Sequence, residues 1–392
     1  MKFSPLLYKI PDYPFRKVGR ISREAEQRNG VRVINARIGI PDVEAPKAIK
    51  EALAKYVLAD KSTFGYPCDV HPERGIPELI EAIIEDYRVK HAVNLRPENI
   101  MVTSWAKEVL YDMAYLFEPG TVFIPDPVYP VYEAATVLSN HRPVRVATSS
   151  ATGWLPEFNF SKKSEKPVAF YFCDPNNPTG AVAGHDYYVN LLKKMKESDV
   201  TGIFDKAYKD YVFDIKTKPF SITQIPEIME RGYEIVSLSK HYNFVGIGLA
   251  WIVSSEANID RWLKASSQHR QGVEWYKQKA GVEALKNPAV KAEMHAYFKE
   301  LKERRDIFVR GLQELGLTVA VSEATPYLWI QAPDGFDDED FVLNTLINKA
   351  HVAFMPGSYF GASGKGYMRA TLFLSRSEIE EALERIRKVK TW

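Results

Sequence analysis

The sequence has almost no cysteine and no long apolar run, and its charges nearly cancel. Two cysteines, Cys68 and Cys173, are too few for a disulfide framework or a cysteine-based zinc site. A net charge of +2 over 392 residues leaves no basic surface of the kind that binds nucleic acid. No apolar run approaches the roughly 18 residues of a membrane span, and no secretion-type leader is recognisable. We therefore expect a cytoplasmic protein without metal, nucleic-acid or membrane partners.

The length of the chain and its apolar pattern predict two domains. At 392 residues the chain exceeds the size at which one hydrophobic core stops growing. Between residues 100 and 254, short apolar runs alternate with helical stretches, which is typical of a mostly parallel sheet between two layers of helices. We expect an α/β fold with a large domain at 46–287 and a smaller α+β domain at 288–392. Residues 1–45, rich in proline and arginine, are expected to form an arm and part of the small domain.

Seven apolar runs are the candidate strands of the large sheet, at 100–103, 121–124, 143–146, 168–172, 200–204, 234–238 and 249–253. Further strands are expected in the tail, at 317–321, 327–331 and 367–373. Helical periodicity is found at 45–58, 76–89, 108–117, 187–196, 289–316, 339–349 and 377–389.

Polar residues stand where these runs end. Asp205 follows the run 200–204, Lys240 follows 234–238, and Asn177 lies in the loop after 168–172. Each is ordinary when taken singly: a helix cap, a lysine whose head reaches solvent, and a turn. Together they favour a binding site, because ligands of open parallel sheets bind beyond the carboxyl ends of the strands.

Arg369 stands inside the apolar run 367–373 and needs an anion, either an internal carboxylate or a ligand. Taken with Asp205, Tyr208, Asn177 and Lys240, it would suit a ligand with a ring nitrogen, a phenolic oxygen, an aldehyde and a phosphate. Pyridoxal 5′-phosphate (PLP) carries all four groups. A lysine Schiff base with an acidic partner for the ring nitrogen is its usual protein setting.

The order and spacing of these residues resemble the class I/II aminotransferase family of fold-type I PLP enzymes. The shared motifs are Asn177-Pro-Thr-Gly180, Asp205-x-x-Tyr208, Ser237-x-Ser-Lys240 and Arg369. The resemblance covers essentially the whole chain and looks closest to the LL-diaminopimelate and alanine/aspartate aminotransferase branch. It implies a homodimeric enzyme that moves the amino group of an L-amino acid to a 2-oxo acid in a ping-pong cycle.

The resemblance also implies roles for individual residues. Lys240 would form the cofactor aldimine and move a proton, Asp205 would keep the ring nitrogen protonated, and Tyr129 would stack on the ring. The other cofactor contacts would be Asn177 and Tyr208 at the phenolic oxygen, Ser237, Trp105, Ala106 and Lys107 at the phosphate, and Tyr66 from the neighbouring subunit. The substrate α-carboxylate would be bound by Arg369 and the Gly39 backbone, beside Asn177 and Tyr129.

Two positions depart from the family pattern. Gly248 stands where the family has an arginine that contacts the phosphate, and Trp105 stands where it often has glycine. The loss of an arginine removes a charge-assisted contact of roughly 1.5–3 kcal/mol. Both departures keep two alternatives open: another PLP reaction (elimination, cyclisation, decarboxylation or an oxidase-type reaction) and a catalytically silent scaffold.

The substrate side chain is not specified by these motifs. Its pocket is expected to draw on Tyr13, Phe15, Arg16, Arg37, Trp105, Tyr129 and the segment 269–276. Aromatic and basic groups of this kind suit an acidic, an aromatic or a dibasic amino acid equally.

Overall fold

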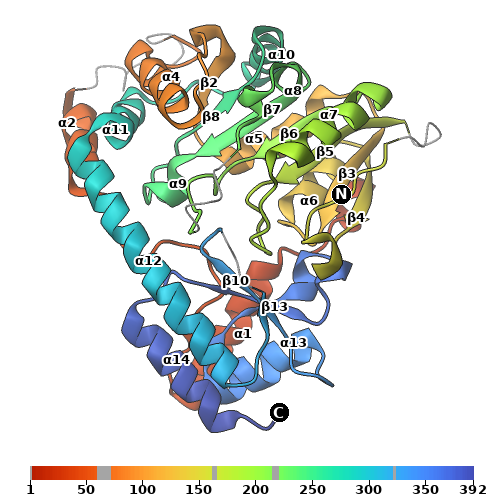
Figure 1. Cartoon of the computed structure of the whole chain (residues 1–392), viewed down its shortest axis with the longest axis vertical. Helices are drawn as coiled ribbons and strands as arrows, with labels where there is room; N and C mark the ends of the chain where they lie inside the picture. Colours follow the sequence, from red (N-terminus) through yellow and green to blue (C-terminus); the bar gives the residue numbers. More distant parts are fainter. Residues whose placement is uncertain (1, 60–71, 161–165, 214–219, 321–323) are drawn as a thin grey trace.

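A seven-stranded sheet between helices forms the upper part of the molecule in Figure 1. The computed structural model describes residues 2–59, 72–160, 166–213, 220–320 and 324–392. The strands are β2 (Ile100–Thr103), β3 (Thr121–Asp126), β4 (Arg142–Ala147), β5 (Pro167–Cys173), β6 (Thr201–Asp205), β7 (Gly232–Ser237) and β8 (Ala250–Val253). They follow the order β2-β8-β7-β6-β5-β3-β4, with β8 antiparallel to both neighbours and the remaining pairs parallel. The prediction of a mostly parallel seven-stranded sheet is confirmed.

Apart from the edge strand β4, which is partly exposed, the strands of this sheet are buried on both faces, which explains why they are continuous apolar runs. In β5, Ala169 and Tyr171 pack into one hydrophobic cluster, whereas Phe170 and Phe172 pack into another on the opposite face. One face is covered by α5 (Ala106–Asp112), α6 (Val131–Leu138) and α10 (Glu256–Ser266). The other is covered by α7 (His185–Ser198), α8 (Pro226–Glu230), α4 (Pro77–His91), α11 (Trp275–Lys286) and α2 (Lys47–Ala59).

An antiparallel four-stranded sheet forms the lower part of the molecule. Its order is β12 (Met355–Pro356), β13 (Tyr367–Thr371), β10 (Tyr327–Gln331) and β9 (Val319–Ala320). Around it lie α12 (Pro288–Glu314), α13 (Asp338–Asp340), the π-helical segment Phe341–Ala350 and α14 (Arg376–Val389). The long helix α12 starts beside α2 and α11 and ends beside α14, so it connects the part with the large sheet to the part with the small sheet (Figure 1).

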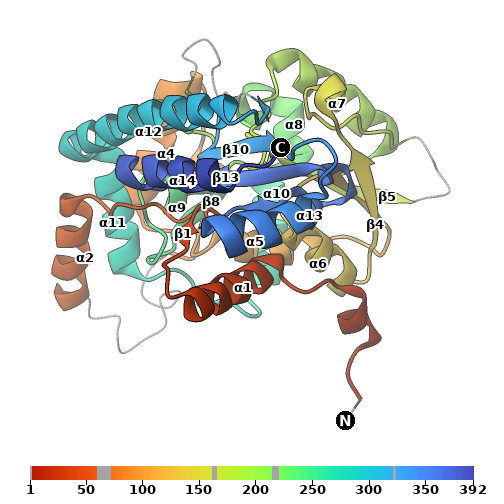
Figure 2. The same cartoon turned by 90° about the horizontal axis from the view of Figure 1, so that it is seen from below.

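The N-terminal segment contains a 16-residue helix, α1 (Pro14–Asn29), that the sequence did not predict. Nearby prolines indicated an interrupted arm, but Pro14 occupies the first helical position, where a missing N–H costs nothing. The buried face of α1 is thin, with only Val18, Gly19, Ser22 and Ala25. After α1, β1 (Ile34–Asn35) pairs in parallel with β11 (Val352–Ala353), which attaches this segment to the C-terminal part (Figure 2).

In the part of the chain that the structure describes, no helix is long and apolar enough to cross a membrane. The same residues contain no group of three or more histidine, cysteine, aspartate or glutamate side chains that could hold a metal ion.

Candidate active site

A cavity of about 390 Å³ lies at the carboxyl ends of β5, β6 and β7. It brings together nearly all the residues that the sequence placed in one site: Gly39, Trp105, Ala106, Lys107, Tyr129, Asn177, Asp205, Tyr208, Ser237, Lys240 and Arg369. Tyr66 lies outside the described residues. Parallel strands end at one edge of a sheet, which brings Asn177, Asp205 and Lys240 together. Gly39 reaches the same place from the N-terminal segment, 201 positions before Lys240 in the chain.

Lys240 lies in the short helix α9 (Leu238–His241), directly after β7. Its Nζ donates a hydrogen bond to the carbonyl oxygen of Gly39, and Tyr211 donates to the Lys240 carbonyl oxygen at 2.7 Å. Burial, together with the positive charge of Arg369, lowers the pKa of Lys240 to about 8. The side chain retains some exposure only because it borders the cavity. A useful fraction of this amine is therefore neutral, and nucleophilic, near neutral pH.

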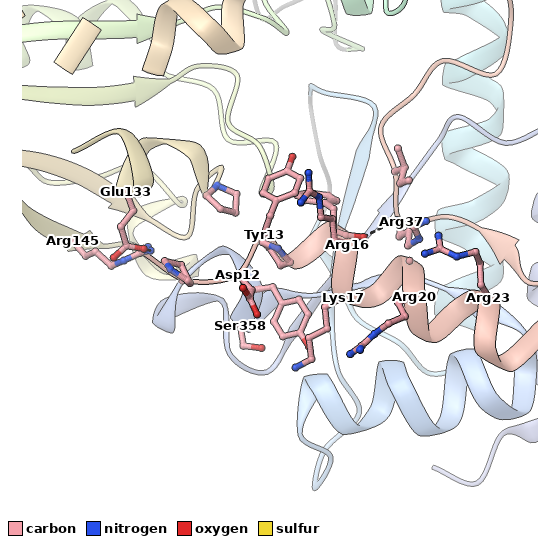
Figure 3. A pocket seen from close by; sticks show the side chains of 18 residues that line it. Asp12, Tyr13, Arg16, Lys17, Arg20, Arg23, Arg37, Glu133, Arg145 and Ser358 are labelled. Carbon is pink, nitrogen blue, oxygen red and sulfur yellow. Dashed lines mark hydrogen bonds and ion pairs between the residues drawn. The ribbon is translucent and has the colours of Figure 1, made fainter. Parts of the chain in front are cut away.

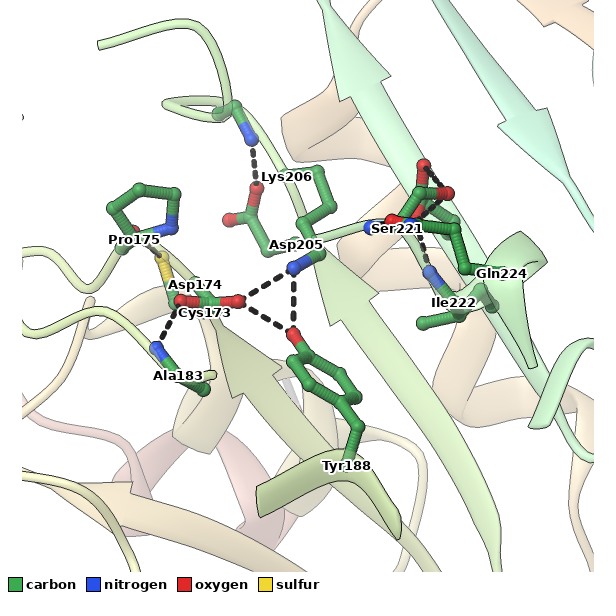
Figure 4. Close-up of polar contacts among 12 residues, drawn as sticks. Cys173, Asp174, Pro175, Ala183, Tyr188, Asp205, Lys206, Ser221, Ile222 and Gln224 are labelled. Carbon is green, nitrogen blue, oxygen red and sulfur yellow. Dashed lines mark hydrogen bonds and ion pairs between the residues drawn. The ribbon is translucent and has the colours of Figure 1, made fainter. Parts of the chain in front are cut away.

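Asp205 is the last residue of β6, and its side chain points into the cavity while that of the next residue points away (Figure 4). Its carboxylate accepts hydrogen bonds from the Tyr132 hydroxyl at 2.6 Å and the Ala207 backbone N–H at 3.0 Å. Burial nevertheless raises the pKa of Asp205, because these bonds offset only part of the cost of desolvating the charge. A protonated nitrogen in the cavity would supply what is missing.

Lys206, the neighbour of Asp205, belongs to a separate buried network. Its Nζ donates to the Asp174 carboxylate and lies within hydrogen-bond distance of the Tyr188 hydroxyl, each at 2.6 Å (Figure 4). Only 1% of the Lys206 side chain and 2% of that of Asp174 are exposed. This ion pair links the ends of β5 and β6 on the side that faces away from the cavity. The two strand ends that precede Asn177 and carry Asp205 are therefore fixed relative to each other.

Arg369 projects from β13 and is 1% exposed. Its two terminal nitrogens donate to Asn177 Oδ1 and to the Arg37 carbonyl oxygen, both at 2.7 Å, while its buried Nε has no partner. The guanidinium lies 4.0 Å from the centroid of the Tyr327 ring. No described carboxylate forms an ion pair with it, so the internal ion pair considered from the sequence is absent here. A buried guanidinium of this kind is suited to a ligand carboxylate.

Tyrosine hydroxyls line the space between Lys240 and Arg369. The Tyr208 hydroxyl lies 3.0 Å from that of Tyr327 and 3.5 Å from Asn177 Nδ2, and the Tyr129 hydroxyl lies 3.2 Å from that of Tyr13. Gly39 is packed against Tyr327 so closely that an added Cβ would stand 1.8 Å from its hydroxyl oxygen. Only glycine fits there.

Sequence reasoning missed two of these contacts. Tyr132 lies in the first turn of α6 and donates the hydrogen bond that supports Asp205. Tyr327 opens β10 and shapes the pocket around Arg369. Both are ordinary aromatic residues in apolar surroundings, and nothing in the local sequence distinguishes them from core residues.

Comparison with known proteins gives the family. Residues 31–386 match the family "Aminotransferase class I and II". The LL-diaminopimelate aminotransferase 2 of Nostoc sp. is 31% identical over 392 residues, covering 98% of each chain, and the LL-diaminopimelate aminotransferase of Halothermothrix orenii is 30% identical, covering 99% of this chain and 98% of that protein. The chain belongs to the class I and II aminotransferases.

Solved aminotransferase-like structures have the same fold. The substrate-bound BacF structure of Bacillus subtilis superposes with a TM-score of 0.89 at 28% identity, covering 100% of this chain and 98% of that one. The aromatic aminotransferase of Pyrococcus horikoshii superposes with a TM-score of 0.82 at 27% identity, covering 94% and 98%.

Class I and II aminotransferases use PLP, and the residues of this cavity fit most of that cofactor. The buried amine of Lys240 suits the aldehyde, and the carboxylate of Asp205 suits a protonated ring nitrogen. At the end of the cavity where the phosphate is expected, the set of cations differs from the family pattern, because Gly248 replaces the arginine. Among the described lining residues the cations are Lys107, Lys240 and Arg369, and Lys107 Nζ lies over the Tyr13 ring at 4.5 Å from its centroid. Ser237 offers its hydroxyl there, and its Oγ accepts from the Ser239 backbone N–H at 3.1 Å.

The two departures from the family pattern, Gly248 and Trp105, touch each other. A Cβ added to Gly248 would stand 2.2 Å from a ring carbon of Trp105, and Gly248 has φ +71°, where only glycine is unstrained. The indole thus fills the volume that any side chain at position 248 would need. The missing arginine and the added tryptophan are one change in packing, not two.

We expect Gly248→Ala to destabilise the protein by about 1–3 kcal/mol, because the methyl group overlaps the indole and the backbone is left-handed. Gly246→Ala is the matched control, since nothing lies within 4 Å of its added Cβ and its φ is not positive. Urea unfolding of both variants measures the difference. In Gly248→Ala/Trp105→Ala the overlap is relieved, so the two effects should not add; additive losses would contradict direct contact.

Proposed function

We propose that this aminotransferase binds an L-amino acid with its α-carboxylate on Arg369 and its amino group beside Lys240. The observation that carries the proposal is the pair of buried cations: a guanidinium with an unused Nε and no described carboxylate partner, near a lysine of lowered pKa. Such a cavity lacks negative charge, which a dianionic cofactor and a carboxylate substrate would supply. PLP, when bound, supplies the aldehyde and the electron-withdrawing ring.

Lys240 is the group that moves protons. With the cofactor bound, its amine would hold the aldehyde in the absence of substrate, and in the presence of substrate it would take the proton from the substrate Cα and carry it toward the cofactor. Gly39 holds the lysine by its carbonyl oxygen, so the amine stays on the substrate side of the cavity. A lowered pKa suits this role, because a base must be neutral to accept a proton near pH 7.

Asp205 keeps the ring nitrogen protonated, and Tyr132 and the Ala207 backbone hold its carboxylate in place. Tyr129 would stack on the ring, and Asn177 and Tyr208 would hold the phenolic oxygen. Ser237, Trp105, Ala106 and Lys107 would hold the phosphate. These residue roles extend the family assignment to individual side chains.

We also propose that the protein acts as a homodimer in which Tyr66 of one subunit reaches the phosphate site of the other. We further propose that the chain is divided into an N-terminal arm with part of the small domain (1–45), a large domain (46–287) and a small domain (288–392), and that the protein is cytoplasmic. Light scattering of the holoenzyme tests the dimer, and loss of PLP affinity in Tyr66→Phe tests the contact.

The substrate pair is the open question within this reaction. Two relatives are named for LL-diaminopimelate, an amino acid with two amino and two carboxyl groups, while Tyr13, Phe15, Trp105 and Tyr129 give the cavity an aromatic lining. A screen of LL-diaminopimelate, L-aspartate and L-phenylalanine without an acceptor distinguishes these classes. One equivalent of 2-oxo acid per site is expected from the true donor. Continuous ammonia release without an acceptor would contradict transamination and indicate another PLP reaction.

The pKa of Lys240 predicts how cofactor attachment depends on pH. Only the neutral amine attacks the aldehyde, and with a pKa of about 8 about a tenth of it is neutral at pH 7. The rate at which apoprotein bonds to added PLP, followed by absorbance, should rise with pH through a midpoint near 8 and level above it. Lys240→Ala should give no covalent absorbance at any pH. A midpoint near 10.5, the ordinary lysine value, would mean that the amine is solvated.

Arg369→Lys should raise KM for the amino acid roughly ten- to a hundredfold, because an ammonium cannot reproduce the two-pronged contact with a carboxylate. The effect on kcat should be smaller, since Lys240 and Asp205 are untouched. Arg376→Lys is the matched control: it makes the same change at an exposed ion pair with Glu303. Equal KM values for the two variants would remove Arg369 from carboxylate binding.

A further inference from the structure

A second cavity, of about 1120 Å³, lies beside the catalytic one and is lined along one side by α1. Arg16, Arg20 and Arg23 leave successive turns of this helix at the spacing i, i+4, i+7, so they share one face. Figure 3 shows Arg23 and Arg37 together at one end of the cavity and Arg145 with Glu133 at the other. The catalytic mechanism uses none of these side chains.

The cavity concentrates positive charge. Six of its lining residues are cations, Arg16, Lys17, Arg20, Arg23, Arg37 and Arg145, against two acids, Asp12 and Glu133. The whole chain carries only +2. This imbalance is local, so it comes from the arrangement of α1 and its neighbours and not from composition.

Half of these cations are already paired. Lys17 binds Glu339 at 2.7 Å, Arg145 binds Glu133 at 2.5 Å, and Arg20 lies 3.8 Å from Glu24 on the exposed side of α1. Arg16, Arg23 and Arg37 form no ion pair with any described carboxylate. These three guanidiniums are the uncompensated part of the cavity.

Arg37 is the best held of the three. Its Nη1 donates to the Phe15 carbonyl oxygen at 3.2 Å, and its Nη2 would lie 3.0 Å from a Cβ at Gly19, so a side chain at position 19 would require the guanidinium to shift. Its Nε is buried without a hydrogen-bond partner. Burial lowers the pKa of Arg37, and the charge of Arg23 lowers it further. Such a group is stabilised by an anion.

A single layer of side chains separates this cavity from the catalytic one. Tyr13, Phe15 and Ile38 line both. The Phe15 ring lies 5.3 Å from the Arg369 guanidinium, and Arg369 donates to the Arg37 carbonyl oxygen at 2.7 Å. A ligand on Arg37 would therefore lie directly behind the wall of the substrate site.

We infer that Arg16, Arg23 and Arg37 form a binding site for a small polyanion with two or more phosphate or carboxylate charges. The ligand neutralises three guanidiniums that have no described carboxylate partner, two of which, Arg23 and Arg37, repel each other, and it joins α1 to the residue whose backbone supports Arg369. Binding at this site and binding of substrate are thus coupled through Phe15 and Arg37. The site does not depend on which amino acid is the substrate.

The test is calorimetric titration of PLP-loaded enzyme with inorganic pyrophosphate at fixed ionic strength. Arg16→Gln/Arg23→Gln should weaken binding about 100-fold, because two charge-assisted contacts are lost. Arg28→Gln is the matched control: it lies on the same helix but bonds to Asn348 outside the cavity, and it should bind like wild type. Both variants change exposed side chains, and circular dichroism verifies that they fold.

Two further arms distinguish this site from anion binding in the catalytic cavity. Citrate in place of pyrophosphate shows whether carboxylates serve as well as phosphates. Arg369→Lys, which alters the substrate site, should retain pyrophosphate binding within a few fold. Binding that is lost in Arg369→Lys and kept in Arg16→Gln/Arg23→Gln would place the anion in the catalytic cavity and overturn the inference. Absence of saturable binding by either anion would overturn it as well.

Discussion

The structure depends on one buried guanidinium. Arg369 comes from the small antiparallel sheet, yet its nitrogens bond to Asn177 at the edge of the large sheet and to Arg37 in the N-terminal segment. It therefore connects three parts of the chain at the point where the substrate is expected to bind. Aromatic rings surround it, and no described carboxylate neutralises it, so its charge remains available to a ligand.

That uncompensated charge also acts on Lys240. A second cation in a desolvated cavity makes the protonated amine less stable, and together with burial it lowers the pKa of Lys240 to about 8. Asp205 experiences the opposite effect: burial raises its pKa, and the hydrogen bonds from Tyr132 and a backbone N–H, with the charge of Lys206, offset only part of that cost. The protein therefore stabilises each of these charges only in part, and a ligand would supply the rest. A binding site differs in this respect from an ion-pair network in which every charge has its partner.

The sequence predicted more of the large sheet than of the N-terminal segment. All seven strands of that sheet were located: six are short apolar runs because both of their faces are buried, and the less buried edge strand β4 was located from the run at 143–146. Helix α1 was missed, since its buried face is thin and Pro14 reads as a break although it starts the helix. Tyr132 and Tyr327 were missed for another reason: a core tyrosine and a tyrosine that supports a site have the same local sequence.

The sequence by itself determined the family, the cofactor and the residues at the strand ends, because polar groups that end apolar strands are recognisable by type and spacing. Only the tertiary structure decided what those residues contact. Gly248 and Trp105, far apart in the chain, became one packing unit only when a Cβ at 248 was found to overlap the indole. Likewise, Arg16, Arg23 and Arg37 became one charged site only when α1 folded beside the segment that follows it. Charge repulsion and steric overlap depend on distance through space, which the order of residues does not specify.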